Sequence, residues 1–299
     1  MEKISDILKR VLKDKDLGNV DQLWQEVKSD PEIRHFLAAH KDEIPPEAQK
    51  TSLAVLYEFY NQRRHPDKVL AGYEPELFMN DGVISVRYKK TRQQQAKEDA
   101  AQKRKNVTLI DLPKQLRDVE LDEIDQTESR IAALGAMGDF LAKVKAGDHP
   151  QGIYLSGAYG VGKTYILAGL ANGYAGLGKK VIFLHVPTFI AGLSDHFSDN
   201  SLSQEINRVS TCDLLILDDI GAETLSQWSR DDVLGVILQH RMDNDLPTFF
   251  SSNLSMEELE RHFAQVRDVD DRVKGARIME RVRYLAKEIT VGGKNRRRR

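Results

Sequence analysis

A glycine-rich octapeptide carries the clearest chemical signal in the sequence. Its residues are Gly157, Ala158, Tyr159, Gly160, Val161, Gly162, Lys163 and Thr164, and they match the pattern G-x-x-x-x-G-K-[ST]. Glycines let the backbone curl so that successive N–H groups point at phosphate oxygens, and a helix beginning there adds the positive end of its dipole. Lys163 then supplies a charge for the β- and γ-phosphates, and Thr164 supplies a hydroxyl for Mg²⁺. The segment therefore predicts a Walker A loop that binds ATP with Mg²⁺.

Two acidic residues, Asp218 and Asp219, directly follow the apolar run at residues 214–217. A buried strand of an open α/β sheet presents such side chains at its carboxyl edge, where ligands bind. We expect Asp218 to complete the Mg²⁺ shell and Asp219 to polarise the attacking water. Read alone, two acids after a strand also fit a helix cap, and the Walker A loop upstream favours the catalytic interpretation.

A third polar group ends the next apolar run, where Ser251 and Ser252 are followed by Asn253. An amide at that edge would lie between the carboxylates and the γ-phosphate, so we expect Asn253 to orient water and to sense hydrolysis. The alternative is an ordinary strand-to-loop turn, because Ser and Asn favour such turns.

Short apolar runs alternate with longer amphipathic segments after residue 107, and this pattern must position these groups. The runs lie at residues 153–155, 181–186, 213–219 and 247–253, with a last one at 284–291. This alternation is typical of an α/β fold, in which a parallel sheet is flanked by helices on both faces.

The first ninety residues read as a small, mainly helical unit. Apolar residues recur at helical spacing within residues 3–14, 23–27 and 53–60, and a hairpin is predicted around Asn80-Asp81-Gly82. Residues 91–106 are basic and lack large apolar side chains, which fits a linker and an exposed helix equally well. We therefore expect domains at 1–90 and 107–299, joined by a basic linker at 91–106.

Composition narrows the class of protein. The 299 residues contain 44 Lys and Arg against 46 Asp and Glu, and a single cysteine, Cys212. One cysteine excludes an internal disulfide framework and a multi-cysteine zinc site, and it favours a reducing, cytoplasmic location. No apolar run approaches the ~20 residues that cross a bilayer, so we expect no membrane insertion. The basic cluster at residues 294–299 is an electrostatic candidate for DNA contact.

The order of Walker A loop, Asp-Asp pair and Asn-bearing strand resembles AAA+ P-loop ATPases. Residues 213–223 (DLLILDDIGAE), 247–253 (PTFFSSN) and 277–285 (RIMERVRYL) resemble the bacterial replicative helicase loader family, in its DnaI branch, and DnaC more distantly. The resemblance spans the whole chain. It implies an N-terminal domain that binds a DnaB-type hexameric helicase, and an AAA+ domain that self-associates and contacts single-stranded DNA. The implied function is ATP-dependent loading of the replicative helicase onto single-stranded DNA during initiation or restart of replication.

The resemblance also implies an arginine finger that acts on ATP in a neighbouring subunit. Arg281 is the best match, with Arg277 and Arg283 as competitors, and pairing with glutamates on a solvated helix is the alternative. An ATPase that depends on such a finger should be weak alone and stimulated by partners. Only sixteen residues follow Arg283, so we expect no full helical lid.

Zinc is not expected. Some members of the resembled family hold zinc with cysteines near the segment equivalent to residues 60–90, where this chain has only His65. The sequence leaves two rival functions open. One is a transposition-helper AAA+ ATPase, and the other is a nucleotide-binding adaptor without significant hydrolysis.

Overall fold

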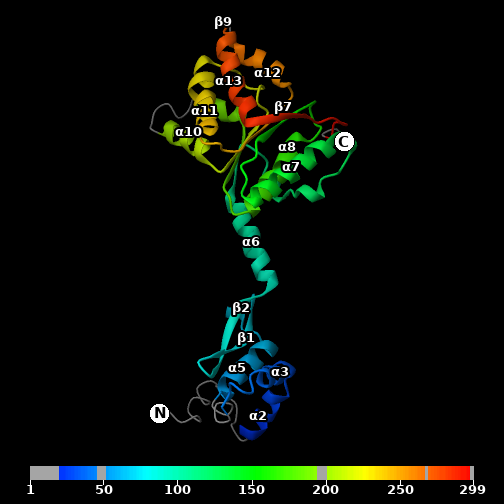
Figure 1. Ribbon diagram of the computed structural model, residues 1–299, viewed down its shortest axis with the longest axis vertical. Helices are drawn as coiled ribbons and strands as arrows, with labels where there is room; N and C mark the ends of the chain where they lie inside the picture. The colour runs from blue at the N-terminus through cyan, green and yellow to red at the C-terminus, as the bar shows by residue number, and fades with distance from the viewer. Residues whose placement is uncertain (1–19, 46–51, 194–200, 267–268, 297–299) are drawn as a thin grey trace. The chain divides into compact units, whose positions relative to one another are not determined.

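The computed structural model describes residues 20–45, 52–193, 201–266 and 269–296, and the chain divides into two compact units, 1–98 and 99–299 (Figure 1). The helix predicted within residues 3–14 lies outside the described residues. Each unit has its own hydrophobic core.

The N-terminal unit packs helices against a hairpin. It contains α2 (Val20–Ser29), α3 (Pro31–Ala39), α5 (Leu53–Arg64), a short 3₁₀ helix (Lys68–Leu70), β1 (Tyr73–Asn80) and β2 (Val83–Lys90). Asp30 caps α3 by accepting from two backbone N–H groups of its first turn, directly before Pro31. The hairpin turns at Asp81 and Gly82, where φ is 48° and 77°, as their sequence predicts. Its core includes the fully buried side chains of Val27, Ile33, Leu56, Phe59 and Ile84.

The basic segment that was compatible with either a linker or an exposed helix is α6 (Arg92–Asn106). None of its residues is buried, which agrees with its lack of large apolar side chains. Its stability must come from helix propensity and surface pairs rather than from packing.

The second unit is built on a six-stranded sheet with the order β10-β4-β7-β6-β5-β3, and every pair of neighbours is parallel. Its strands are β3 (Val107–Ile110), β4 (Gly152–Ser156), β5 (Val181–His185), β6 (Leu214–Asp218), β7 (Thr248–Ser252) and β10 (Ala286–Thr290). Five of them lie at the apolar runs of the sequence. The short edge strand β3 was not predicted.

Helices cover both faces of this sheet, as predicted. One face packs against α7 (Glu128–Ala146) and α8 (Lys163–Gly176). The other packs against α9 (Val186–Leu193), α10 (Ser201–Thr211), α11 (Gly235–Asp243), α12 (Met256–Ala264) and α13 (Arg272–Leu285). Alternate residues of β6 enter opposite cores: Leu214 and Ile216 one, Leu215 and Leu217 the other.

Shorter elements connect these layers. They are the 3₁₀ helices η2 (Lys114–Asp118) and η3 (Leu121–Glu123), the π-helix η5 (Ser229–Leu234), and the two-residue strands β8 (Gln265–Val266) and β9 (Val269–Asp270). After β10, the described residues 291–296 contain no helix. In the part of the chain that the structure describes, no helix has the length and apolarity needed to cross a membrane.

Arg241 is fully buried and joins α11 to the loops that precede β6 and β7. Its guanidinium donates to the carbonyl oxygens of Ser210, Cys212 and Pro247 and to Thr248 Oγ1. Cys212 is buried beside it, and burial raises the pKa of its thiol. The cysteine is therefore unsuited to act as a nucleophile.

Candidate nucleotide-binding and hydrolysis site

The glycine-rich octapeptide forms the turn between β4 and α8, as a Walker A loop requires. Gly162 has a φ of 100°, and a Cβ atom there would lie 2.0 Å from Nη2 of Arg130. Arg130 is itself buried under the loop and donates from Nη2 and Nε to the carbonyl oxygen of Val161, at 2.5 and 3.2 Å. Only glycine satisfies both the backbone conformation and this close approach.

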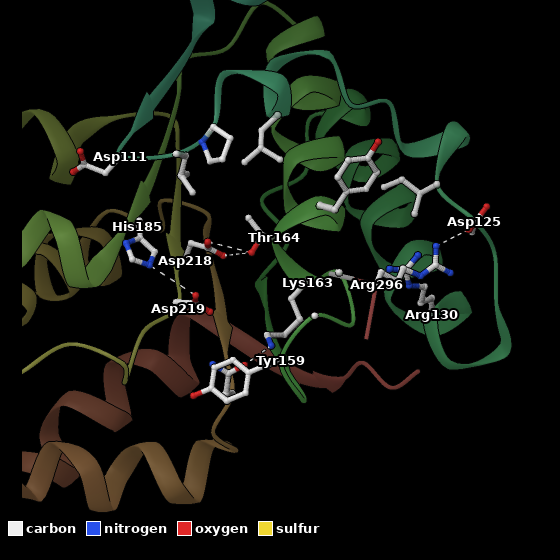
Figure 2. Close-up of a pocket in the computed structure, with 18 of the residues that line it drawn as sticks. Asp111, Asp125, Arg130, Tyr159, Lys163, Thr164, His185, Asp218, Asp219 and Arg296 are labelled. Carbon is white, nitrogen blue, oxygen red and sulfur yellow. Dashed lines mark hydrogen bonds and ion pairs between the residues drawn. The ribbon is translucent and has the colours of Figure 1, made fainter. Parts of the chain in front are cut away.

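Lys163 points back into the loop and reaches the end of β7, the neighbour of β4 in the sheet (Figure 2). Its Nζ donates to the carbonyl oxygens of Gly157 and Ala158, at 2.7 and 3.1 Å, and to Asn253 Oδ1 at 2.7 Å. The side chain is 5% exposed. Lysine and asparagine, ninety residues apart in sequence, thus meet at one point.

Thr164 and Asp218 face each other at the carboxyl edge of β6. Thr164 Oγ1 lies 3.0 and 3.1 Å from the two carboxylate oxygens, and Ser251 Oγ donates to Asp218 Oδ1 at 2.5 Å. Burial raises the pKa of Asp218 to about 6; the Asp219 charge acts in the same direction, whereas the Ser251 and Thr164 hydrogen bonds oppose it. Ser251 was not singled out in the sequence, where it reads as part of a turn.

A hydroxyl and a carboxylate suit Mg²⁺, which binds oxygen ligands and usually takes only one or two protein carboxylates beside water and phosphates. Within the described ranges, no group of three or more His, Cys, Asp or Glu side chains is arranged to hold a metal ion. Thr164 and Asp218 therefore fit a magnesium that shares its shell with a phosphate.

Asp219 has a left-handed backbone, with φ at 53°. This conformation costs a non-glycine residue about 1–2 kcal/mol, and such strain often marks functional sites. The Asp219 N–H donates to Ser251 Oγ at 3.0 Å, and its carboxylate lies 3.8 Å from His185 Nε2 (Figure 2). His185 in turn has Nδ1 2.6 Å from Thr188 Oγ1. His185 is not among the residues singled out from the sequence, and only the structure brings it to Asp219.

The order of the strands explains why these groups converge. β7 lies between β4 and β6, so Asn253 follows the strand that separates the Walker A loop from the Asp-Asp pair. The carboxyl ends of all three strands open into one cavity of about 820 Å³. Its wall includes Lys163, Thr164, Asp218, Asp219 and Asn253, and on another side the apolar residues Leu112, Pro113, Leu116 and Ile124.

Residues after β10 lie against the Walker A loop. The N–H of Val291 donates to the Ser156 carbonyl at 2.7 Å, and that of Arg296 donates to the Gly160 carbonyl at 2.9 Å. Arg296 also lines the cavity and pairs with Asp125 at 2.5 Å (Figure 2). The first arginine of the basic C-terminal cluster thus belongs to the nucleotide cavity, and residues 297–299 lie outside the described part.

The three candidate finger arginines all lie on α13, and none of them is among the described residues that line the cavity. Arg281 is half-buried and donates to Gln239 Oε1 at 2.8 Å and to the Gly235 carbonyl at 3.2 Å. Arg283 pairs with Glu260 at 2.5 Å, and Arg277 is exposed. Arg281 and Arg283 therefore bind partners on neighbouring helices, α11 and α12, rather than glutamates of α13.

The parallel sheet, the Walker A loop and the acidic end of β6 together define a P-loop ATP-binding protein of the AAA+ class. Residues 1–88 match the family model described as primosomal protein DnaI N-terminus, and residues 89–299 match the model of IstB-like ATP binding protein. The chain therefore belongs to the IstB-like ATP-binding family, in its branch of DnaI-type replicative helicase loaders.

Known relatives agree with this placement. The replicative helicase loader DnaI of Bacillus subtilis (strain 168) is 35% identical over a 293-residue alignment that covers 93% of this chain and 93% of that protein. A crystal structure of DnaI is 36% identical, with a TM-score of 0.57 over 65% of this chain and 99% of that one. A putative primosome component from Streptococcus pyogenes serotype M3 is 39% identical, with a TM-score of 0.56 over 66% of this chain and 98% of that one. The loader DnaC of Escherichia coli (strain K12) is 29% identical over 130 residues, 43% of this chain and 48% of DnaC.

Proposed function

We propose that this chain uses ATP to load a DnaB-type hexameric replicative helicase onto single-stranded DNA, in the cytoplasm. One observation carries the proposal: the DnaI N-terminal unit and the ATP-binding unit occur together on one chain, and the similarity to a named helicase loader extends over both. Residues 1–90 would bind the helicase, and residues 107–299 would bind ATP and DNA, with 91–106 between them.

ATP would occupy the 820 Å³ cavity. Its phosphates would lie on the backbone N–H groups of residues 157–164 and against Lys163, and its base on the apolar wall that contains Leu112 and Pro113. Thr164 and Asp218 would hold Mg²⁺, which neutralises phosphate charge when bound. The assignment is supported by the 3.0 Å approach of the threonine hydroxyl to the Asp218 carboxylate.

Hydrolysis would depend on Asp219 and Asn253. Asp219 would accept a proton from the attacking water, because its side chain lines the cavity. Asn253 lies 2.7 Å from Lys163 Nζ, so a γ-phosphate held by the lysine would be within reach of the amide. The amide would orient the water and respond to loss of the phosphate.

Arg281 would complete the site of a neighbouring copy. The side chain lies on α13, away from the cavity of its own chain, which is the placement that an in-trans finger needs. Such a finger accelerates hydrolysis by about 10³–10⁵-fold in other nucleotide hydrolases. A single copy would therefore hydrolyse ATP slowly, and self-association through the AAA+ unit would stimulate it.

Single-stranded DNA would bind near α9, which directly follows β5, and the segment after β6. These two segments line a groove of about 550 Å³ that contains Pro187, Ile190 and Trp228. An aromatic side chain in such a groove can stack on a base, which is worth about 1–3 kcal/mol per base. Phe189, the aromatic residue of α9, is only 5% exposed and belongs to the core. We expect Trp228→Phe to bind labelled oligo-dT like the unaltered chain and Trp228→Ala to bind about 5- to 100-fold more weakly in fluorescence anisotropy; equal binding by both variants would exclude the groove.

The decisive experiment measures helicase loading by the full chain. Hexameric helicase, circular single-stranded DNA and ATP are mixed with the unaltered chain or with Asp219→Asn, and DNA-bound helicase and ATP turnover are both recorded. We expect loading by the unaltered chain, and ATP binding without turnover by Asp219→Asn. Unchanged turnover in Asp219→Asn would refute the catalytic assignment. Absence of any complex with the helicase, together with binding to a transposase and duplex DNA, would establish the transposition-helper alternative instead.

A further inference from the structure

Arg281 is held by α11, the helix that packs against α13. Its Nε donates to Gln239 Oε1 at 2.8 Å and its Nη1 to the Gly235 carbonyl at 3.2 Å. Gly235 directly follows the π-helix η5, and a Cβ atom there would lie 3.2 Å from Arg281 Nη1. A π-helical turn is rare and occurs most often near functional sites. The Arg281 side chain is therefore half-buried and hydrogen-bonded to α11 rather than extended into solvent.

A second hydrogen bond fixes the amide that receives Arg281. Gln239 Nε2 donates to Asp243 Oδ1 at 2.7 Å, one turn further along the same helix. An ionised carboxylate only accepts, so the amide nitrogen must face Asp243 and the amide oxygen must face Arg281. Asp243, Gln239 and Arg281 form a relay in which each group sets the orientation of the next.

The relay uses only some of the N–H donors of the Arg281 guanidinium. A guanidinium has five N–H groups in a planar fork, which suits two-point binding to phosphate. Two are donated to α11, and Arg281 lines a groove of about 480 Å³ together with Asp231, Val236, His240 and Asn244. Asp231 is paired with Arg230 and Lys274, so its charge is already balanced.

We propose that Gln239 is a positioning residue for ATP hydrolysis, and that Asp243 orients it. The inference rests on the proposed role of Arg281 as a finger for ATP bound by a neighbouring copy. Gln239 holds the guanidinium so that its remaining donors face outward in one arrangement. A finger fixed before association loses less conformational freedom in the transition state than a mobile one. Loss of the Gln239 amide therefore lowers kcat and leaves the binding of ATP to Lys163 and Thr164 unchanged.

The test uses the full chain with helicase, single-stranded DNA and ATP. Gln239→Met keeps the length of the side chain and removes both hydrogen bonds. We expect stimulated kcat to fall by about 10-fold, as for other supporting residues, with KM and nucleotide affinity unchanged. Asp243→Ala should lower kcat in the same way, whereas Asp243→Asn keeps an acceptor for Gln239 and should restore it. Thermal unfolding of each variant checks that the fold is intact.

The variant Arg281→Ala distinguishes the positioning role of Gln239 from the finger role of Arg281. If Gln239 acts through Arg281, Gln239→Met has no further effect in an Arg281→Ala background. Unaltered stimulated turnover in Arg281→Ala refutes the finger itself. Loss of turnover in Arg281→Ala with wild-type kcat in both Gln239→Met and Asp243→Ala overturns the positioning role and leaves the finger standing. A Gln239→Met effect that persists undiminished in Arg281→Ala likewise overturns it, because the glutamine then acts on α11 packing alone.

Discussion

Replacement of Ser251 by alanine should shift the pH dependence of Mg²⁺ binding. Ser251 is fully buried on β7; its hydroxyl donates to Asp218 and accepts the Asp219 N–H. Burial raises the pKa of Asp218 to about 6, and the hydroxyl opposes that rise by stabilising the carboxylate. A hydrogen bond to a charged group contributes about 1.5–3 kcal/mol, and one pKa unit corresponds to about 1.4 kcal/mol. We therefore expect Ser251→Ala to raise the pKa of Asp218 by about 1 to 2 units.

The carboxylate binds a metal ion only when it is deprotonated. Apparent Mg²⁺ affinity should therefore increase with pH up to the pKa of Asp218 and level off above it. In the unaltered chain the break should fall near a pH of about 6. In Ser251→Ala it should lie about 1 to 2 units higher, which makes Mg²⁺ binding about 2- to 10-fold weaker near pH 7 and nearly equal near pH 9.

The assay is a Mg²⁺ titration of a fluorescent nucleotide analogue bound to the full chain, repeated from about pH 5.5 to about pH 9. Protonation of the nucleotide itself is the same for every variant and cancels in the comparison. Ser252→Ala is the matched control, because Ser252 is equally buried on β7 and donates to the Ile220 carbonyl instead, at 2.6 Å. A break that stays near 6 in Ser251→Ala, or that moves equally in Ser252→Ala, would refute the reasoning.

Three further predictions concern stability. The pKa of Asp218 in the folded chain is raised from 3.8 to about 6, so its charge destabilises the fold progressively as pH rises from about 4 to about 6. In urea unfolding without Mg²⁺, Asp218→Asn should therefore be about 3 kcal/mol more stable than the unaltered chain near pH 8. Near pH 4 the two stabilities should agree within about 1 kcal/mol. Gly157→Ala places a Cβ atom 2.1 Å from the Val291 carbonyl oxygen at a φ of 145°, so it should lower Tm and weaken ATP binding. Gly178→Ala, with a φ of 80° and open space around the Cβ, should cost only about 1 kcal/mol. Arg241→Met leaves buried carbonyl groups unpaired and should cost about 3–5 kcal/mol in the same urea assay; a loss below about 1 kcal/mol would contradict the bracing role of Arg241.

The convergence of Lys163, Asp218 and Asn253 was predictable because it follows from local signals and one general rule. Each residue stands at the carboxyl end of an apolar run, or one loop beyond it, and parallel strands bring those ends to a common edge. The sequence does not state that β7 lies between β4 and β6, but any order that made them neighbours would bring the three groups together.

Contacts without a local pattern could not be predicted. Arg130 occurs in a helix where a basic residue normally faces water, and its burial depends on the Walker A loop 31 residues away. Arg296 belongs to a cluster that reads as a solvated or DNA-binding end, and its place against Gly160 depends on the pairing of β10 with β4. Gln239 gives no signal at all, because a glutamine on an exposed helix face is ordinary and its partner lies on another helix.

The placement of Lys163 and Arg281 on different elements has a genetic consequence. Lys163 begins α8 on one face of the sheet, whereas Arg281 lies on α13 on the other. Under the proposed in-trans role of Arg281, a chain with Lys163→Ala would lose its own ATP and still supply Arg281 to the next copy, so such an allele should interfere with wild-type chains in mixed assemblies. Arg281→Ala chains would keep ATP and fail their neighbours. The two alleles should therefore complement each other in part when they are expressed together, because a mixed pair retains one complete site.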